Sequence, residues 1–319
     1  MDVSKYTLLI TGGAGFIGSH LAEYLHQQNA KVFIVDNLST GDIKNIQHLK
    51  NIEFIEADIN DSEKLKKIFQ EIDFVFHLAA LGSINRSIEN PLNTHHTNAT
   101  GFLNIIQLAK EYTVKGLVYS SSSSVYGDDT HFPKTESKTG KPLSPYAVTK
   151  ISNEWYAHVF YKLFGLPVIG LRYFNVFGPR QNPNGPYAAV IPTFIQKMLR
   201  NEPVYIHGTG AQKRDFTYVD NVVYANILAM QAILQNKVPS IGEVYNVGCH
   251  QTICINEVFQ ILSEKLHYTQ KPIYTEARKG DIFQSWADIE KAHQLLNYSP
   301  RVFFNEGIDK TIAYYKNIE

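Results

Sequence analysis

The sequence predicts an α/β protein with a doubly wound parallel sheet, followed by a smaller C-terminal α+β lobe. Short apolar runs rich in β-branched and aromatic residues alternate with helical patterns throughout residues 1–175. A glycine-rich turn directly follows the first apolar run, where such proteins connect their first strand and helix. Beyond residue 175 the segments become shorter, and Pro and Gly become more frequent. We therefore expect one domain over 1–175 and a lobe over 176–319, with segments near 218–247 returning to the first domain.

The composition of the 319-residue chain is that of an ordinary soluble globular protein, with 44% hydrophobic and 19% charged residues. Thirty basic residues balance thirty acidic ones, so no net charge favours a nucleic acid or an anionic membrane as partner. No segment reaches the roughly 20 apolar residues of a membrane span, and the N-terminus lacks the apolar region of a signal peptide. Cys249 and Cys254 make no disulfide framework, and no His or Cys cluster has zinc spacing. We expect a cytoplasmic protein without a metal site.

Six apolar runs are expected to form buried parallel strands, at residues 6–10, 31–35, 52–58, 74–80, 116–119 and 167–172. The helices that connect them are expected over residues 19–28, 61–71, 93–110 and 145–165. A surface loop over 128–143 precedes the last of these helices. In the second half we expect a helix near 188–200 and a short strand at 203–207, and the segments that could return to the large sheet are 218–234 and 244–247.

Gly12, Gly15 and Gly18 follow the first strand with the spacing Gly-x-x-Gly-x-x-Gly. The first glycine permits a tight turn, the second lets the backbone approach a pyrophosphate, and the third allows close helix–strand packing. With the flanking strand and helix they predict a dinucleotide-binding (Rossmann) unit, although a plain glycine turn in another α/β protein would look similar.

Asp36 ends the second strand about 20 residues after the glycines, where a carboxylate accepts hydrogen bonds from the hydroxyls of the adenosine ribose. This carboxylate would repel a 2′-phosphate, and no Arg or Lys stands directly beside it in the following residues 37–40. NAD is therefore favoured over NADP as the dinucleotide. The alternative interpretation is an Asp that merely caps a loop.

Polar and small residues follow several further strands, at the carboxyl edge where open α/β sheets bind ligands. Asp58 and Ile59 follow the third strand, where an adenine ring is expected, and the small residues of 78–80 leave room for a cofactor beside the backbone. Five serines, residues 120–124, end the fifth strand, and we expect their hydroxyls to point into a cleft. Asn98 on the helix over 93–110 is interpreted equally well as a structural polar contact or as a cofactor contact.

The stretch 144–150, Ser-Pro-Tyr-Ala-Val-Thr-Lys, begins the helix expected over 145–165. Tyr146 and Lys150 are four residues apart, so they lie on one face of that helix. A lysine ammonium there can lower the pKa of the phenol from about 10, which would make Tyr146 a general base near neutral pH. Because Tyr-x-x-x-Lys is common by chance, a surface Tyr and a solvated Lys would be the simpler interpretation of this pair alone.

Taken together, these motifs resemble those of the extended short-chain dehydrogenases/reductases, in the branch of nucleotide-sugar epimerases and dehydratases. The motifs are the three glycines, Asp36, Ser122 ahead of Val125-Tyr126-Gly127, the Tyr146–Lys150 pair, and Tyr173-Phe174-Asn175-Val176-x-Gly178-Pro179. The similarity covers nearly the whole chain. Within that branch the chain is most similar to bacterial UDP-N-acetylglucosamine 4-epimerases of surface-polysaccharide assembly, in residues 81–87, 180–185 and 280–289.

The resemblance implies NAD as cofactor and a catalytic set of Ser122, Tyr146 and Lys150. Tyr146 would take the proton from the sugar 4-hydroxyl, Lys150 would bind the nicotinamide ribose, and Ser122 would bond to the 4-oxygen. The cofactor-binding residues that we expect are Gly12, Gly15, Phe16, Ile17, Gly18, Asp36, Asn37, Ser39, Thr40, Gly41, Asp58, Ile59, Leu78, Ala79, Ala80, Asn98, Ser120, Tyr146, Lys150, Tyr173 and Val176.

The resemblance also implies a set of residues that bind a UDP-sugar substrate. These are Ser83, Arg86, Ser122, Ser123, Tyr146, Asn175, Ala189, Val190, Tyr205, Arg214, Arg278, Asp281 and Ser285. Arg214, Arg278 and Asp281 would hold the diphosphate and the uridine ribose, a task that suits the planar fork of arginine. Without the resemblance, solvated surface arginines would be the simpler interpretation.

The reaction implied is a reversible inversion at C4 of a UDP-N-acetylhexosamine (UDP-GlcNAc/UDP-GalNAc), through transient oxidation by bound NAD to a 4-keto sugar. Ser285 is small where epimerases limited to plain hexoses carry a bulky residue, which leaves room for an acetamide. A UDP-glucose 4-epimerase and a UDP-N-acetylglucosaminuronic acid 4-epimerase stay open as alternatives. A dehydratase or decarboxylase is less expected, because Ser123 and Ser124 stand where those enzymes place an acid. A non-catalytic nucleotide sensor is less expected because the Tyr–Lys pair is present.

The family commonly pairs through two long helices, and in this chain the helices over 93–110 and 145–163 are the candidates. The resemblance therefore implies a homodimer.

Overall fold

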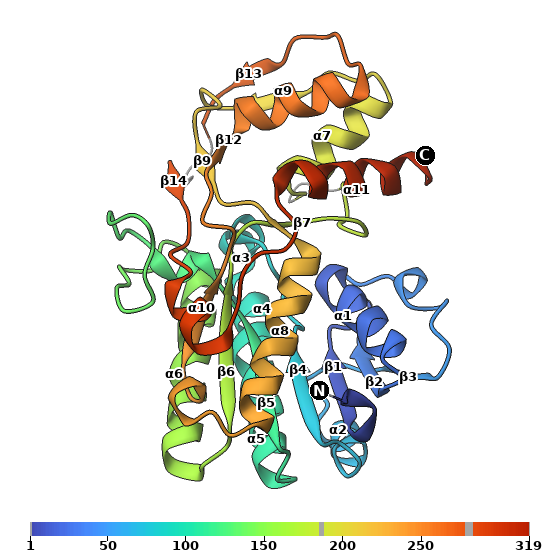
Figure 1. Cartoon of the computed structure of the whole chain (residues 1–319), viewed down its shortest axis with the longest axis vertical. Coiled ribbons are helices and arrows are strands. Elements are labelled where there is room, and N and C mark those ends of the chain that lie inside the picture. Colours follow the sequence, from blue (N-terminus) through green and yellow to red (C-terminus); the bar gives the residue numbers. More distant parts are fainter. Residues whose placement is uncertain (1, 185–187, 278–282, 319) are drawn as a thin grey trace.

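The computed structural model describes residues 2–184, 188–277 and 283–318 of the chain. Its larger part is a wholly parallel seven-stranded sheet with the order β11-β6-β5-β4-β1-β2-β3 (Figure 1). From β1 the chain first builds one side of this sheet and then, from β4, the other, so the predicted doubly wound fold is confirmed. The strands are β1 (Thr7–Thr11), β2 (Lys31–Asp36), β3 (Ile52–Glu56), β4 (Phe74–His77), β5 (Gly116–Ser122), β6 (Val168–Tyr173) and β11 (Val244–Val247).

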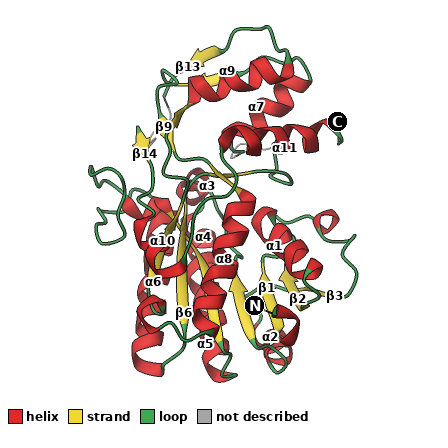
Figure 2. Cartoon of the chain, in the orientation of Figure 1, coloured by secondary structure: helices red, strands yellow, loops and turns green. Residues whose placement is uncertain are grey.

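Helices cover both faces of the large sheet (Figure 2). One face packs against α1 (Phe16–Gln27), α8 (Val219–Leu234) and α10 (Glu290–Leu296), and the other against α2 (Ser62–Phe69), α5 (Gly101–Glu111) and α6 (Pro145–Phe164). Alternate residues of a strand point to opposite faces, so Leu8 and Ile10 of β1 join the first core whereas Leu9 joins the second. Burial on both faces explains why the strands read as continuous apolar runs.

The helix expected over 145–165 forms as α6, over Pro145–Phe164. Ser144 caps its start by accepting a hydrogen bond from the backbone N–H of Ala147 at 3.2 Å, and Gly165 ends it in the left-handed conformation with a φ of 68°. Strand β5 is longer than expected and includes Ser120–Ser122, because these residues pair in register with Leu171–Tyr173 of β6. The first three serines of the run are therefore part of the sheet rather than of a loop.

The helix expected over 93–110 is divided into α4 (Pro91–His95), a π-helical turn η3 (His96–Thr100) and α5. The side chain of Asn98 in the wide turn accepts a hydrogen bond from the Leu81 N–H at 2.8 Å and donates one to the Leu81 carbonyl at 3.2 Å. A π turn changes which side chains face inward, and such turns often occur beside functional sites. A further short helix, α3 (Ile84–Glu89), which the sequence did not predict, lies in the preceding loop.

The smaller lobe has its own core, between α7 (Val190–Leu199), α9 (Ile255–Leu266) and α11 (Phe304–Lys316). Its strands form three small sheets: β8 (Tyr205–His207) with β13 (Ile273–Thr275), β9 (Lys213–Arg214) between β12 (Ile253–Cys254) and β14 (Gln284–Ser285), and β7 (Val176–Phe177) with β10 (Thr217–Tyr218). Figure 1 shows this lobe above the carboxyl edge of the large sheet. Helix α8 and strand β11 follow β10 in sequence but pack in the large sheet domain, so the chain passes between the two parts more than once.

Among the residues that the structure describes, the 3₁₀ turns are η1 (Val3–Lys5), η2 (Ile43–Asn45), η4 (Ser123–Tyr126) and η5 (Val238–Ser240). Within the described ranges, no helix combines the length and apolar character needed to cross a membrane. The same ranges contain no group of three or more His, Cys, Asp or Glu side chains placed to hold a metal ion. Cys249 and Cys254 both carry free thiols.

Candidate active site

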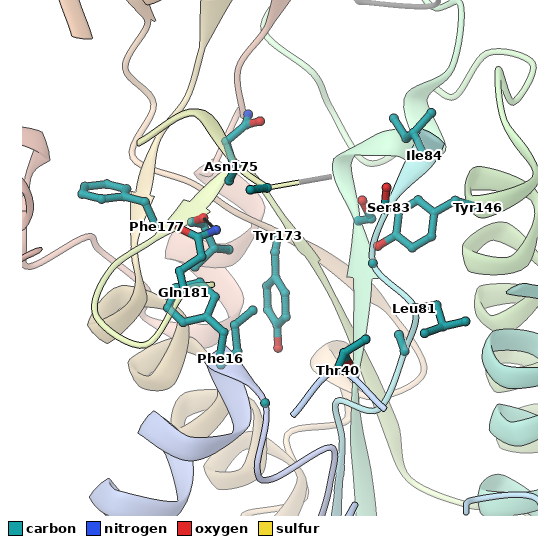
Figure 3. Close-up of a pocket in the computed structure, with 18 of the residues that line it drawn as sticks. Phe16, Thr40, Leu81, Ser83, Ile84, Tyr146, Tyr173, Asn175, Phe177 and Gln181 are labelled. Atoms are coloured by element: carbon teal, nitrogen blue, oxygen red, sulfur yellow. Dashed lines mark hydrogen bonds between the residues drawn. The ribbon is translucent and has the colours of Figure 1, made fainter. Parts of the chain in front are cut away.

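A cavity of about 1420 Å³ lies between the carboxyl edge of the large sheet and the smaller lobe. Figure 3 shows side chains from both parts meeting in it, with Tyr146 on one side and Phe16 and Gln181 on the other. The wall contains these residues predicted from the sequence: Gly12, Gly15, Phe16, Ile17, Gly18, Asp36, Asn37, Ser39, Thr40, Ile59, Leu78, Ala79, Ala80, Ser83, Ser120, Ser122, Ser123, Tyr146, Lys150, Tyr173, Asn175, Val176, Ala189, Val190, Tyr205, Arg214 and Ser285.

The glycine turn brings the backbone close to the cavity, as its spacing predicts. Gly12 has a φ of +72°, and a Cβ placed on it would lie 2.7 Å from the backbone of Ala79. A Cβ on Gly18 would lie 2.1 Å from the Gly12 carbonyl oxygen, so the close helix–strand contact also requires glycine. Gly15 is the N-cap of α1, whose first N–H groups have no partner within the helix. This cradle fits a pyrophosphate, because helix N-termini bind anions through such N–H groups.

Asp36 lies on the cavity wall at the end of β2. Its carboxylate accepts hydrogen bonds from the N–H groups of Ala14 at 3.0 Å and Leu38 at 2.9 Å, and burial raises its pKa. A carboxylate oxygen can accept more than one hydrogen bond, so each still has capacity for a ribose hydroxyl. A Cβ on Gly41 would come within 3.0 Å of this carboxylate, so Gly41 provides clearance for Asp36 rather than part of the cavity wall.

Asp58 and Asn98 were predicted as cofactor contacts, but neither lies on the cavity wall. The Asp58 carboxylate accepts a hydrogen bond from the side-chain amide of Asn37 at 2.7 Å. Asp58 therefore positions Asn37, which lines the cavity, without lining it itself. Asn98 is buried and bonds both backbone groups of Leu81, and its amide also donates to the Thr149 hydroxyl at 3.3 Å. These bonds favour the structural interpretation of Asn98, because its side chain links a cavity loop to α6.

The predicted catalytic residues converge at the end of β5. Tyr146 is half-buried on the cavity wall; burial raises the pKa of its phenol, and a hydrogen bond with Ser122 opposes that rise. Lys150 is buried, and its ammonium donates to the Ser120 carbonyl at 2.7 Å and to the Ser120 hydroxyl at 3.1 Å. Burial lowers the pKa of Lys150 to about 8, and the charge of Glu154 opposes this fall.

The pKa of Tyr146 is shifted in the opposite direction to the one that the sequence suggested. Lys150 was expected to lower the pKa of Tyr146, but burial dominates and raises it. The reason is geometric: the Lys150 Nζ is directed at Ser120 and lies 5.9 Å from the centre of the Tyr146 ring. The hydrogen bond with Ser122 is the interaction that favours the phenolate here.

The smaller lobe supplies the opposite end of the cavity. Arg214 of β9 and Ser285 of β14 are direct neighbours in a parallel strand pair, and both line the cavity. Tyr205 of β8 is 44% exposed and offers a ring face, with the Lys197 Nζ 5.0 Å from the ring centre. Asn175 has a φ of +28° and donates a long 3.4 Å hydrogen bond to the Asp215 carbonyl. These groups can bind an anionic ligand that also carries a flat ring.

One predicted substrate residue among those that the structure describes, Arg86, does not line the wall. Arg86 lies on α3 behind Ser83, whose hydroxyl caps the helix by accepting from the Arg86 N–H at 3.2 Å. Arg278 and Asp281 lie outside the described residues.

Several wall residues were not predicted from the sequence. On α7, Thr193, Phe194 and Lys197 join Val190 on the cavity side, and the three-to-four-residue spacing of that helix was a signal that could have found them. Gln181, His207, Gln212 and Glu276 come from loops and short strands, where no periodic pattern marks them.

Three comparisons with known proteins bear on this site. A model of the NAD dependent epimerase/dehydratase family matches residues 8–248. The UDP-glucuronate 4-epimerase of Thermodesulfobacterium geofontis is 35% identical over 98% of this chain and 97% of its own length. The crystal structure of the Thermotoga maritima UDP-glucose 4-epimerase with UDP-glucose has a TM-score of 0.93 and 39% identity, and it covers 98% of this chain and all of that one.

A second solved structure is equally similar and has a different ligand. The UDP-N-acetylglucosamine 4-epimerase of Methanobrevibacter ruminantium in complex with UDP-N-acetylmuramic acid has a TM-score of 0.93 and 38% identity. The match covers 98% of this chain and 99% of that one. These three proteins share the name of a 4-epimerase and differ in the sugar that is named.

Proposed function

The chain belongs to the NAD dependent epimerase/dehydratase family, and on this premise we propose that it inverts C4 of a UDP-N-acetylhexosamine, interconverting UDP-GlcNAc and UDP-GalNAc. The observation that carries the proposal is the convergence of Tyr146, Ser122 and Lys150 on one cavity whose far end presents Arg214 and Ser285. NAD is the cofactor of the family, and the glycine cradle and Asp36 described above fit its pyrophosphate and ribose.

The proposed proton transfer uses Tyr146 and Ser122. Tyr146 accepts the proton of the sugar 4-hydroxyl, and Ser122, which already bonds the phenol, holds the 4-oxygen in line with it. When bound, NAD supplies the reversible hydride acceptor for C4. The phenol returns the proton after the 4-keto sugar has turned its other face toward the site, so one residue serves both directions of the reaction.

Lys150 provides positive charge at the same place. Its pKa of about 8 keeps most of its amine protonated at pH 7, and its bonds to Ser120 fix the ammonium at the end of β5. From there it holds the ribose next to the nicotinamide and favours the ionised phenol once ligands exclude water from the cavity. Because burial alone raises the pKa of Tyr146, the proposed base depends on this assistance.

The nucleotide end of the substrate must be held firmly while the sugar turns. Arg214 offers a guanidinium for the diphosphate, and Tyr205 a ring face for the uracil. Ser285 lies beside Arg214 in the strand pair, and its small side chain leaves space where an N-acetyl group would be accommodated. Binding energy placed on the UDP part, rather than on the sugar, lets both sugar orientations react.

Two other substrates use the same catalytic groups: UDP-glucose and UDP-N-acetylglucosaminuronic acid. Space beside Ser285 favours the N-acetyl sugar over plain glucose. A 4,6-dehydratase or decarboxylase is disfavoured because Ser123, at the start of η4, stands where those reactions need an acid.

We also propose that the enzyme works in the cytoplasm as a homodimer that pairs through α6 and the segment 93–110, which comprises the end of α4, η3 and most of α5. Helices α4 and α6 pack together and expose large apolar side chains: Leu92 is 83%, Trp155 67% and Leu163 72% exposed. Large apolar side chains that gather on the surface of a monomer are typical of an interface, and these three are the ones that the proposed dimer would bury. Sedimentation equilibrium should give twice the chain mass, and Trp155→Glu should reduce it to the monomer mass. A monomeric wild-type protein would refute this arrangement.

The substrate is tested by incubating the purified protein, without added cofactor, with each of the three UDP-sugars and following the products by ¹H NMR. We expect the C4 epimer of UDP-N-acetylglucosamine to form at the highest kcat/KM. Faster conversion of UDP-glucose or of the uronic acid would replace the proposed sugar, and a product other than a C4 epimer would refute the reaction.

A further inference from the structure

The three serines at the end of β5 each face one residue of α6. Ser122 bonds with Tyr146 and Ser120 with Lys150, as described above. The remaining one, Ser121, donates a 2.5 Å hydrogen bond to the Glu154 carboxylate. Tyr146, Lys150 and Glu154 follow each other at intervals of four, so they form one stripe along the helix. Glu154 therefore extends the proposed catalytic stripe by one turn, outside the cavity wall.

A buried ion pair holds Glu154 in place. Arg172 of β6 donates to both carboxylate oxygens, from Nε at 2.9 Å and from Nη2 at 2.8 Å. The Arg172 side chain is 4% exposed and that of Glu154 13%. The remaining Nη1 of Arg172 donates to the Tyr126 hydroxyl at 3.0 Å and to the Glu136 carbonyl at 3.2 Å. Arg172 pairs with Ser121 in the β5–β6 register. The Glu154 carboxylate of α6 therefore bonds to both adjacent strands, through Ser121 of β5 and Arg172 of β6.

Glu154 is also the acidic group whose charge acts on Lys150 and opposes the effect of burial. The other titratable groups that face Lys150 do not add negative charge. His77 behind it is fully buried, and burial lowers its pKa to about 3, so its ring is neutral. Tyr146 has a raised pKa and is neutral in the unliganded site. Around Glu154 itself are Arg172 and the buried phenol of Tyr119, whose pKa burial also raises.

We propose that Glu154 is a positioning residue of the active site: its carboxylate, clamped by Ser121 and Arg172, holds the stripe of α6 on β5 and keeps Lys150 in the ammonium form. The catalytic role of the Lys150 ammonium rests on the function proposed above. The hydrogen bonds of Glu154 and the charge of Lys150 do not depend on that function. The competing interpretation is an ion pair that only fastens α6 to the sheet and leaves the titration of Lys150 unchanged.

The test is Glu154→Gln, with Glu243→Gln as the matched control because Glu243 forms a 2.7 Å but solvent-exposed pair with Lys291. Lysines labelled with ¹³C at Cε are titrated by NMR in the protein as purified, with Lys150 assigned from its absence in Lys150→Met. We expect Glu154→Gln to lower the pKa of Lys150 by about 1 unit, the lower end of the effect of a nearby opposite charge. The kcat at pH 7.5 should fall at least about threefold, from the smaller ammonium fraction, with KM nearly unchanged. The alkaline limb of the kcat profile should move to lower pH, and Glu243→Gln should change none of these.

An unchanged Lys150 pKa and an unchanged alkaline limb in folded Glu154→Gln would overturn the proposal, even if the melting temperature falls. Removing one partner of a buried pair can prevent folding, so the double variant Glu154→Gln/Arg172→Met, which removes both charges, is measured as well. In the double variant the loss of the Arg172 cation opposes the loss of the Glu154 anion, so the Lys150 pKa should fall less than in Glu154→Gln; no fall in either variant overturns the proposal. Tyr146→Phe separates the two proposals. Near-normal turnover in that variant refutes the epimerase mechanism, but the fall of the Lys150 pKa in Glu154→Gln is still expected.

Discussion

Gly18→Ala tests whether the glycine turn is shaped for a dinucleotide. The new Cβ would lie 2.1 Å from the Gly12 carbonyl oxygen and 2.8 Å from the Gly13 Cα, whereas ordinary van der Waals contacts begin at 3.4 Å. Both neighbours are backbone atoms, so the turn must open by more than 1 Å. The Gly12 carbonyl also accepts a hydrogen bond from the Gly15 N–H at 3.1 Å, and this bond would be distorted.

Overpacking of this kind costs about 1–3 kcal/mol. If the cost falls on the bound state, NAD affinity decreases by about 5- to 150-fold, since about 1.4 kcal/mol corresponds to a factor of ten. The assay is the ratio of NAD to protein after gel filtration, with a titration calorimetry measurement of the Kd.

Gly165→Ala is the control, because Gly165 ends α6 outside the cavity wall and a Cβ there would have no atom within 4 Å, although its φ of +68° strains any other residue. It should retain NAD like the wild type. Equal NAD content in Gly18→Ala and wild type would refute the role assigned to the contact between Gly18 and the Gly12 carbonyl. If both glycine variants lose the same amount of NAD, this contact is not the cause of the loss.

The remaining predictions concern the ribose, the sugar and Lys150. Asp36→Ala should lose NAD during purification, because the carboxylate that faces the cavity accepts the ribose hydroxyls; unchanged NAD content would remove that role. Ser285→Tyr should impair UDP-N-acetylglucosamine more than UDP-glucose, and an equal loss of kcat/KM on both would discredit the space beside Ser285. Lys150→Met should abolish turnover and yet raise the melting temperature at pH 7. The pKa of Lys150 is about 8 in the folded state and about 10.5 in the unfolded state, so the charged amine destabilises the folded protein at pH 7. That stability advantage should shrink as pH rises from about 8 to about 10.5, and a melting-temperature difference that does not vary with pH would contradict the shift.

Local patterns were sufficient for the elements that carry the site. The continuous apolar runs occur because the sheet is covered on both faces, and the glycine spacing specifies a turn in which Gly12 and Gly18 leave no room for a Cβ. The positions of Tyr146 and Lys150 on one face of α6 follow from a spacing of four and from the Ser144 cap. Each of these depends on neighbours in sequence, which is why a single chain reveals them.

Properties that depend on distant residues could not be predicted in this way. The π turn around Asn98 exists because its side chain bonds Leu81, and no periodicity indicates it. The direction of the Tyr146 pKa was expected wrongly because it depends on burial by the assembled site. Nothing in the sequence marks Glu154 as the partner of Arg172, since the pair arises only when α6 packs on β6.

The central claim is that the Tyr146 hydroxyl transfers the proton in a C4 epimerisation, and Tyr146→Phe tests it most directly. The measurement is the rate at which UDP-GalNAc appears from UDP-GlcNAc by ¹H NMR, without added cofactor. Tyr156→Phe is the control on the exposed side of the same helix. We predict that Tyr146→Phe keeps its fold and bound NAD but is slower by about 10²–10⁴-fold, while Tyr156→Phe matches the wild type. A Tyr146→Phe rate within a fewfold of the wild type would contradict the account.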